Sequence, residues 1–203
     1  ITKKDAQWFE KAMADQREDA ADRVTSVPFG LDVEGRKHDC IDQPPTKVLH
    51  LGAMDWTPNV QGVTWLKDEV WPEVHRAMPH VELLLAGRNM PESWVSDAHL
   101  GIRILGEVES AEDTYDTPCA VVIPLHAGSG MRIKLAEALA SGRPVITTSK
   151  GMEGLDLTHE EHVLVANTTE DMQAALMRVL KDDVLAVKLG KNGRNWALEH
   201  LDH

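Results

Sequence analysis

The sequence predicts an α/β fold in which helices cover both faces of a doubly wound parallel sheet of about six strands. Short apolar, β-branched runs alternate with amphipathic stretches of helical length from Lys47 to the end of the chain. One run, CAVVI at 119–123, is apolar at every position, as expected of a strand buried on both faces. A chain of 203 residues that is 42% hydrophobic is long enough to bury the core of such a domain.

The expected strands are the apolar segments rich in valine, isoleucine and leucine. In chain order they are Val48–Gly52, Val81–Ala86, Ile102–Leu105, Cys119–Ile123, Pro144–Thr148 and His162–Ala166.

Helical patterns fall between and after these strands. Ser110 followed by Asp113 indicates a capped helix that continues through Tyr115. A short helix is expected after Pro91. The other expected helices are at 59–78, 131–141, 169–180 and 184–200.

Residues before Lys47 are expected to lie outside this domain. A short helix is predicted at 5–14 and a short strand at 23–32. Residues 33–46 have little periodicity and contain Pro44 and Pro45, so they are the best linker candidate. We therefore divide the chain into 1–32, a linker at 33–46, and a domain at 47–203.

The helix expected at 131–141 has an apolar face and is ended by a glycine. Ile133, Ala136, Leu139 and Ala140 are spaced to lie on one buried face. Gly142 is expected to end the helix, because glycine adopts the conformation that commonly follows a helix.

The start of this helix carries the residues that predict a function. The preceding loop ends in Gly128, Ser129 and Gly130, and backbone N–H groups at a helix start form a site for an anion. Arg132 and Lys134 are expected in the first turn, where the helix dipole disfavours cations. A phosphate or diphosphate bound between them would remove that conflict.

Glu137 follows on the same stripe as Lys134 and is placed to accept hydrogen bonds from hydroxyl groups. Together these residues suit a nucleoside diphosphate with its ribose. Two simpler interpretations remain open: Glu137 pairs with Lys134 on a solvated face, and Arg132 is an ordinary surface residue. Lys150 and Glu153, after the fifth strand, are candidates for contact with a sugar.

Composition argues against several other classes of protein. The formal net charge is −12 with no basic face, so nucleic acid is not an expected partner. Cys40 and Cys119 are interpreted as reduced thiols of a cytoplasmic protein. No apolar run is long enough to cross a membrane, and no signal peptide is visible. The histidines lack zinc-type spacing, so no metal is expected. Since the chain starts at Ile1, a fragment is expected.

Several segments resemble the carboxyl-terminal, donor-binding domain of retaining glycosyltransferases of the GT-B fold, family 4 (group 1). The most specific is PLHAGSGMRIKLAEALASGRPVI at 124–146, followed by GMEGL at 151–155. Others are LGAMDWTPNVQGVTWL at 51–66, LLLAGR at 83–88 and ILGEV at 104–108. The resemblance implies a Rossmann-like domain. VPFGLD at 27–32 is similar to the segment that joins the two domains of such enzymes, so 1–32 would be the tail of a missing amino-terminal acceptor domain.

The resemblance also implies roles for individual residues. Glu137 would hold the donor ribose, and the base would lie near Val108 to Ser110, mostly against backbone. A second glutamate of the family, eight residues before Glu137, is replaced by Ser129. No metal or other cofactor is implied.

The sequence departs from the family in its phosphate cations. Many members carry an arginine and a lysine after the first strand, where this chain has Ala53 and Pro58-Asn59. Arg132 and Lys134 would replace them, as in members with a GSG-x-R-x-K segment.

The function implied is transfer of a sugar, as in hexosyltransferases, from a nucleotide-diphosphate sugar to an acceptor with retention. The partners would be the nucleotide sugar and the missing domain with its acceptor, so this chain alone should be inactive. One alternative is a GT-B sugar-nucleotide epimerase, which would need acid/base carboxylates. The other is a non-catalytic α/β nucleotide-binding or receiver module, for which Asp55 is the only phosphorylatable candidate after the first strand.

Overall fold

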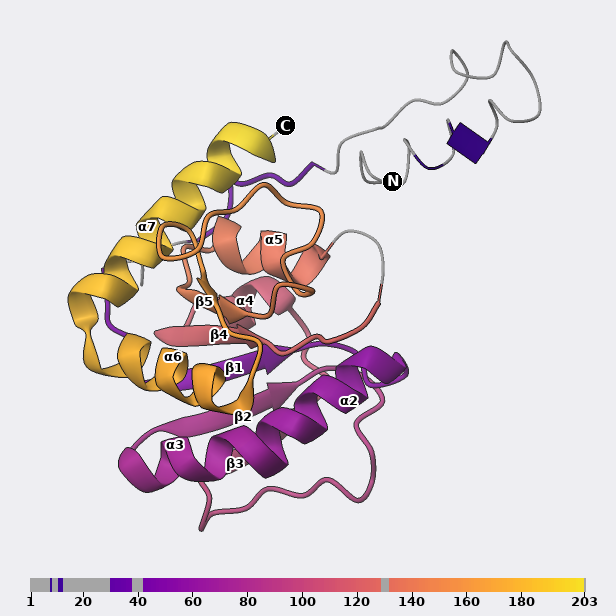
Figure 1. Cartoon of the computed structure of the whole chain (residues 1–203), viewed down its shortest axis with the longest axis vertical. Coiled ribbons are helices and arrows are strands. Elements are labelled where there is room, and N and C mark those ends of the chain that lie inside the picture. Colours follow the sequence, from indigo (N-terminus) through magenta and orange to yellow (C-terminus); the bar gives the residue numbers. More distant parts are fainter. Residues whose placement is uncertain (1–7, 9–10, 13–29, 38–41, 129–131, 203) are drawn as a thin grey trace.

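The computed structural model describes residues 8, 11–12, 30–37, 42–128 and 132–202. Over these residues the chain forms one six-stranded sheet in the order β3-β2-β1-β4-β5-β6, and every pair of neighbours is parallel (Figure 1). The predicted fold class is confirmed. The strands are β1 (Lys47–Leu51), β2 (Glu82–Ala86), β3 (Ile102–Gly106), β4 (Cys119–Ile123), β5 (Val145–Thr147) and β6 (Leu164–Val165).

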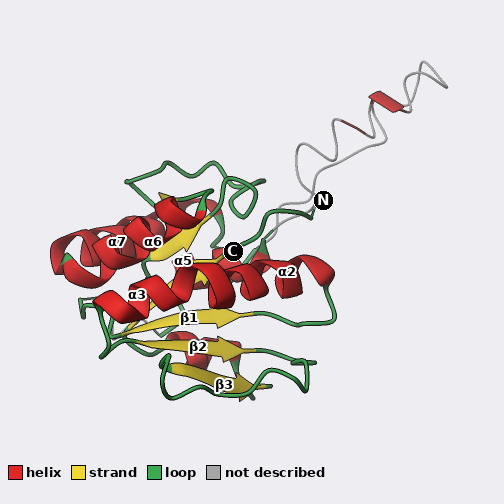
Figure 2. Cartoon of the chain, turned by 60° about the horizontal axis from the view of Figure 1, so that its bottom comes forward, coloured by secondary structure: helices red, strands yellow, loops and turns green. Residues whose placement is uncertain are grey.

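Helices cover both faces of this sheet. The helix formed by α2, η2 and α3 lies over β1, β2 and β3 (Figure 2). The helical segments are α2 (Thr57–Trp65), η2 (Leu66–Val70), α3 (Trp71–Ala77), α4 (Ala111–Tyr115), α5 (Ile133–Ala140), α6 (Thr169–Lys181) and α7 (Asp183–His200).

Alternate strand residues enter two separate cores, as the pleat of a strand requires. Val48 of β1 and Val122 of β4 face the core beneath α2, α3 and α6. Leu49 and Val121 face the core beneath α4 and α5. The α7 helix contributes to both cores along its length. The helices that follow the neighbouring strands β1 and β4 therefore lie on opposite faces of the sheet, the arrangement in which ligands bind at the carboxyl ends of such strands.

The helix expected at 59–78 contains a π-helical turn, η2, between α2 and α3. Pro72 lies at the start of α3 and cannot donate to a carbonyl four residues earlier. The N–H of Trp71 instead bonds to the carbonyl of Leu66, five residues back. The sequence predicted the length of this helix correctly but gave no sign of the π-helical turn inside it.

The short helix expected after Pro91 was wrong. That segment forms turns that end in an antiparallel bridge between Asp97 and Ile102. The Ser96 hydroxyl accepts a hydrogen bond from the N–H of Ile104, and Asp97 accepts one from His99. Such side-chain bonds to nearby backbone compete with a helix.

Two expectations about α5 need correction. The helix begins at Ile133, so Arg132 is its N-cap rather than a residue of its first turn. Ile133 is 50% exposed and not on the buried face, which is formed by Leu135, Ala136, Ala138, Leu139 and Ala140. The end of the helix was predicted correctly, because Gly142 has a φ of +66° and its N–H bonds to the carbonyl of Leu139.

Residues 31–36, which we call the strap, pack against the domain. Leu31 forms a bridge with Asp202, and Val33 is fully buried. The helix expected at 5–14 and the strand expected at 23–32 lie almost entirely outside the described residues. The division into 1–32, 33–46 and 47–203 stays a prediction.

Candidate functional site

The candidate site lies where the strand order reverses, between β1 and β4. The chain leaves β1 toward α2 on one face and leaves β4 toward α5 on the other. The described parts of the two loops, at 52–56 and 124–128, therefore lead toward opposite faces from the carboxyl ends of the two strands, and we call the place between them the crevice. Ligands of doubly wound sheets bind at this position.

Glycines allow the two sides of the crevice to approach each other. A Cβ atom on Gly62 of α2 would lie 2.1 Å from the carbonyl oxygen of Pro124. A Cβ atom on Gly128 would lie 2.6 Å from the Trp56 ring, and Gly128 has a φ of +107°. Gly128 therefore has a backbone conformation that residues with a side chain rarely adopt. Ser129 and Gly130 lie outside the described residues.

Lys134 extends from α5 across the crevice to the end of β1. Its Nζ donates a 2.6 Å hydrogen bond to Oδ1 of Asn59, whose Nδ2 donates to the carbonyl of Ala53 at 2.7 Å. A Cβ atom on Gly52 would lie 2.6 Å from this Nζ. The ammonium group therefore lies beside Ala53 and Asn59, the positions that lack the expected cations.

Burial lowers the pKa of Lys134 to about 8, and the nearby charge of Arg132 adds to this shift. A bound anion would oppose both effects. Lys134 is thus a cation whose charge is sensitive to a ligand.

His50 of β1 is a buried polar residue that the sequence analysis did not select. Its Nδ1 lies 3.0 Å from the carbonyl oxygen of Val122, and burial lowers its pKa to about 3, with Lys134 adding to the shift. The ring is therefore neutral, and Nδ1 carries the proton donated to that carbonyl. Its Nε2 has no hydrogen-bond partner among the described residues and lies toward Gly52. The available signal was one histidine within an otherwise apolar strand.

Arg132 is buried, with 4% of its surface exposed, so the alternative of an ordinary surface residue was wrong. Its Nη2 donates to the carbonyl of Gly128 at 3.0 Å and to that of Lys150 at 3.4 Å. The guanidinium also lies 5.7 Å from the centre of the Trp56 ring. Burial lowers its pKa, and Glu153 opposes this shift. Arg132 thus connects the loops that follow β4 and β5.

Glu137 pairs with Arg36 of the strap, with Oε1 and Nη2 separated by 3.7 Å. The alternative of a pair with Lys134 was wrong, because the ammonium group of Lys134 is directed to Asn59. Burial raises the pKa of Glu137, and the charge of Arg36 opposes that shift.

Val108 and Ser110, predicted to lie near the base, directly precede α4, and Ser110 is its N-cap. Val108 packs against the core that α5 also contacts. Ser110 caps α4, since its hydroxyl accepts a 3.1 Å hydrogen bond from the N–H of Asp113. The hydroxyl of Tyr115, at the end of α4, donates to the carbonyl of Lys134 at 3.4 Å. The loop at 108–110 is therefore connected through α4 to α5.

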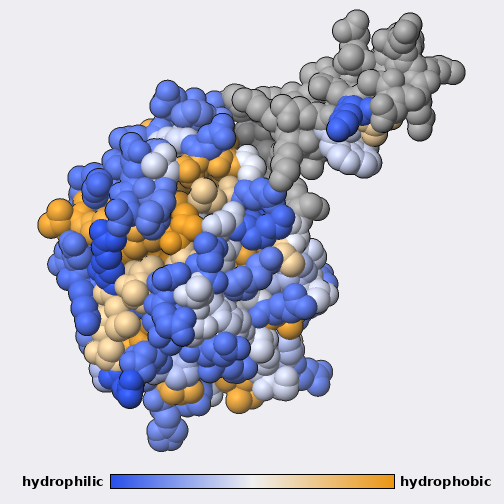
Figure 3. Space-filling view, viewed as in Figure 1, coloured by the Kyte–Doolittle hydropathy of each residue, from blue (hydrophilic) through white to orange (hydrophobic). Residues whose placement is uncertain are grey.

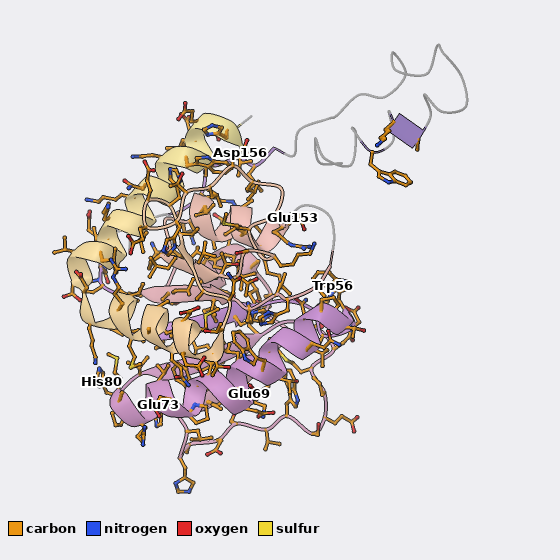
Figure 4. The ribbon with its side chains drawn as sticks, viewed as in Figure 1. Trp56, Glu69, Glu73, His80, Glu153 and Asp156 are labelled. Atoms are coloured by element: carbon orange, nitrogen blue, oxygen red, sulfur yellow. The ribbon has the colours of Figure 1, made fainter. Side chains whose placement is uncertain are left out.

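A cavity of about 490 Å³ adjoins the crevice on the side of β5 and β6. His126 lines it and packs edge-on against Trp65, with ring centres 4.5 Å apart. Trp56 and Glu153 lie on the side to which the strands point (Figure 4). The lining residues are His126, Thr148, Ser149, Lys150, Met152, Glu153, Gly154, Leu155 and Asn167.

Neither a metal-binding cluster nor a membrane-spanning helix is present among the described residues. Within them, no group of three histidine, cysteine, aspartate or glutamate side chains is arranged to hold a metal ion. Within the same ranges, no helix is long and apolar enough to cross a membrane. Hydrophilic residues cover much of the face shown in Figure 3.

Comparison with solved structures confirms the architecture. The C-terminal domain of a group 1 glycosyl transferase family protein (LpcC) from Francisella tularensis has a TM-score of 0.66 and 17% identity, over 84% of this chain and 97% of that one. The Anabaena protein Alr3699/HepE, in complex with UDP and glucose, has a TM-score of 0.70 and 16% identity, over 97% and 57% of the two chains. At these identities the likeness concerns the fold.

Sequence comparison identifies the family. An uncharacterized 44.6 kDa protein in the cps region of Klebsiella pneumoniae is 28% identical over an alignment of 141 residues, which covers 64% of this chain and 36% of that protein. The family model described as glycosyl transferases group 1 matches residues 45–182, most of the chain. The chain therefore belongs to the group 1 glycosyltransferases.

Proposed function

We propose that the crevice between β1 and β4 binds a nucleotide-diphosphate sugar, and that this chain is the donor-binding part of a retaining glycosyltransferase of the hexosyltransferase type. The observation that carries the proposal is the position of Lys134. Its ammonium group lies at the end of β1, beside Ala53 and Asn59, where the sequence lacks the family's cations.

The diphosphate would be held by Lys134 and by the amino-terminal end of α5. That end has no side-chain cap and no acidic residue in its first turn. Its N–H groups and dipole therefore favour an anion. In glycosyl transfer, negative charge develops on the departing diphosphate, and preorganised donors and cations stabilise it. Arg132 would contribute its charge and hold the loop that contains Gly128.

The ribose would be held by Glu137 and the base by the loop at 108–110. A half-buried carboxylate on α5 can accept hydrogen bonds from both ribose hydroxyls. We propose no metal and no other cofactor, since the two cations and the backbone donors supply the electrostatic contribution. The sugar would extend toward the cavity lined by Lys150 and Glu153.

This chain covers 36% of its Klebsiella relative, and the acceptor site would belong to the rest of such a protein. We therefore expect no turnover from this chain alone. The Anabaena neighbour was solved with UDP and with UDP-glucose, which makes UDP the first nucleotide to test.

The proposal is tested by calorimetry with UDP, GDP and ADP and their nucleosides. One diphosphate should bind more tightly than its nucleoside, and Lys134→Met should remove most of that difference. Lys181→Met, an exposed lysine at the end of α6, is the matched control and should leave binding unchanged. If no nucleoside diphosphate binds the wild-type chain, the proposed function is wrong.

A further inference from the structure

The strap is fixed to the end of α7. The N–H of Leu31 donates to the carbonyl of Leu201 at 2.8 Å. The Oδ1 of Asp202 accepts from the N–H of Val33 at 2.7 Å and from that of Glu34 at 3.2 Å. Val33 is fully buried in the core beneath α5. The strap is therefore held by backbone bonds as well as by burial of a side chain.

A buried arginine connects the strap to α5 as well. Arg194 of α7 donates from Nη2 to the carbonyl of Val33 at 3.1 Å and from Nη1 to the carbonyl of Ala140, the last residue of α5. Arg194 is 6% exposed. The strap also turns at residues 32–35, where the side chain of Asp32 accepts a hydrogen bond from the N–H of Gly35 at 2.8 Å. The position of the next residue, Arg36, is thus fixed relative to α5.

Arg36 meets Glu137 at the end of this path. The exposed fractions of the two side chains are 14% and 22%, so water screens the pair less than a surface pair. Lys37, the next residue, pairs instead with Asp113 of α4, and these side chains are 56% and 65% exposed. Arg36 and the adjacent Lys37 therefore differ in burial and in partner.

We propose that Arg36 is a positioning residue for the nucleotide site: it orients the Glu137 carboxylate and keeps it charged for the donor's ribose. This inference rests on the proposed function. Nη2 of Arg36 and Oε1 of Glu137 are 3.7 Å apart, which is longer than a close hydrogen bond. Arg36 can therefore hold the carboxylate from one side while its oxygens still accept from hydroxyl groups.

Two groups with a charge or a proton face Glu137: Arg36 from the strap and Tyr115 from α4. Lys134 lies one turn earlier on α5. Burial raises the pKa of Tyr115 well above its ordinary value, so its hydroxyl stays protonated. Lys134 is directed away toward Asn59. Arg36 is therefore the cation placed to oppose protonation of Glu137 when the pH falls.

The test compares Arg36→Gln with wild type by calorimetry, using the tightest binder of UDP, GDP and ADP and its 2′-deoxy form. Arg36→Gln should weaken the ribonucleotide by about tenfold, the equivalent of one charge-assisted hydrogen bond. It should weaken the 2′-deoxynucleotide much less, since that ligand lacks one hydroxyl for Glu137 to bind. The preference for ribose over deoxyribose should therefore shrink.

A pH series from 5 to 8 gives a second measure. The loss of affinity on acidification should begin at a higher pH in Arg36→Gln than in wild type, because Glu137 protonates more easily without the arginine. Arg36→Lys keeps the charge, so it should restore most of the acid-side behaviour. Lys37→Gln removes an adjacent cation with no contact to Glu137 and should change neither measure.

The outcomes separate this inference from the proposed function. Tighter binding by Arg36→Gln would mean that Arg36 occupies the place of the ribose, and the inference would be overturned. Unchanged binding by Arg36→Gln, with a loss in Glu137→Gln, would overturn the inference alone. If Arg36→Gln does not fold, the pH series on Arg36→Lys decides. The inference would be overturned if Arg36→Lys, which keeps the charge, lost affinity on acidification at a higher pH than wild type. No nucleotide binding by the wild type would overturn both.

Discussion

Lys134 and Asn59 join the two sides of the crevice through a 2.6 Å hydrogen bond from Nζ to Oδ1. The orientation of the Asn59 amide is fixed, because its Nδ2 donates to the carbonyl of Ala53. Asn59 is 4% exposed, so this arrangement is preorganised rather than solvated. A cation carried by α5, the helix after β4, thus lies at the end of β1.

The first prediction concerns the pH dependence of diphosphate binding. The pKa of Lys134 is about 8, so its charge disappears as pH rises above that value. Affinity for the nucleoside diphosphate should therefore fall between pH 7 and 9, while affinity for the nucleoside should not. Calorimetry of both ligands in wild type and Lys134→Met measures this. An equal pH dependence in Lys134→Met would exclude Lys134 as its cause.

The free energy of unfolding should depend on the charge of Lys134 as well, but it should rise with pH where the affinity for the diphosphate falls. The pKa of Lys134 in the folded chain lies below the ordinary value of 10.5 for a lysine side chain. Between about pH 8 and 10.5 the unfolded chain therefore binds more protons, and stability from this residue rises with pH. Urea melts in this window should show a rise that Lys134→Met lacks.

The second prediction concerns Glu137→Gln, which keeps the shape and removes the charge. Charge-assisted hydrogen bonds contribute roughly 1.5–3 kcal/mol each, so nucleotide binding should weaken by tenfold or more. Thermal stability near pH 7 should change little, because the lost pair with Arg36 is offset by relief from burying a charge. Nucleotide dissociation constants of wild type and variant are the measurement, and equal values would remove Glu137 from the site.

The linkage of Glu137 to pH follows from its raised pKa. A carboxyl group with a raised folded pKa contributes stability below its ordinary value of 4.5, and that contribution is lost as pH rises through the folded pKa. Wild type should show this loss between pH 4.5 and the folded pKa, and Glu137→Gln should not.

The parallel sheet was predictable because each strand carries a local signal. Runs such as CAVVI are apolar throughout, and capping residues such as Ser110 mark helix starts at short range. The π-turn near Pro72 and the turns after Pro91 were missed, because they depend on individual backbone and side-chain bonds. Sequence periodicity does not contain that information.

The site was predictable where its residues share one helix. Lys134 and Glu137 were found from helical spacing, but their partners are distant in sequence. Asn59 lies 75 residues before Lys134, and Arg36 comes from a segment interpreted as a linker. Trp56 lies beside Gly128, 72 residues later in the chain, and no local pattern indicates that contact. Contacts between distant segments follow from topology, which one sequence specifies only in outline.

The third prediction revises an argument based on the helix dipole alone. Repulsion in a first turn would make Arg132→Ala neutral or slightly stabilising without ligand. The structure instead places Arg132 at the N-cap, buried, with bonds to the carbonyls of Gly128 and Lys150. These hydrogen bonds are half-buried and come from a charged donor, so losing them costs about 1–3 kcal/mol, and Arg132→Ala should destabilise the fold by about that amount.

The control for this prediction is Arg103→Ala, which removes an exposed pair with Glu82 and should change stability by less than about 0.5 kcal/mol. Denaturant melts compare the two variants. With ligand, Arg132→Ala should weaken a nucleoside diphosphate more than the nucleoside. Equal losses would mean that Arg132 holds the loop and does not meet the phosphates.

The last prediction concerns where the folding unit begins. The predicted domain starts at Lys47, yet Val33 of the strap is fully buried and Leu31 bonds to Leu201. Burial of a valine side chain contributes about 1.5–3 kcal/mol. A chain that starts at Gly30 should therefore melt cooperatively with nearly the stability of the full chain, whereas one that starts at Pro44 should lose about that amount.

Val33→Ala in the full chain separates burial from truncation, because it removes two methyl groups and leaves the backbone bonds to Asp202 in place. Val33→Ala should lose part of the stability that the chain starting at Pro44 loses. Glu34→Ala changes an exposed neighbour in the same strap and should lose little stability. Equal stability of the chains that start at Gly30 and Pro44 would place the boundary after the strap. In that case the burial of Val33 would contribute nothing to folding.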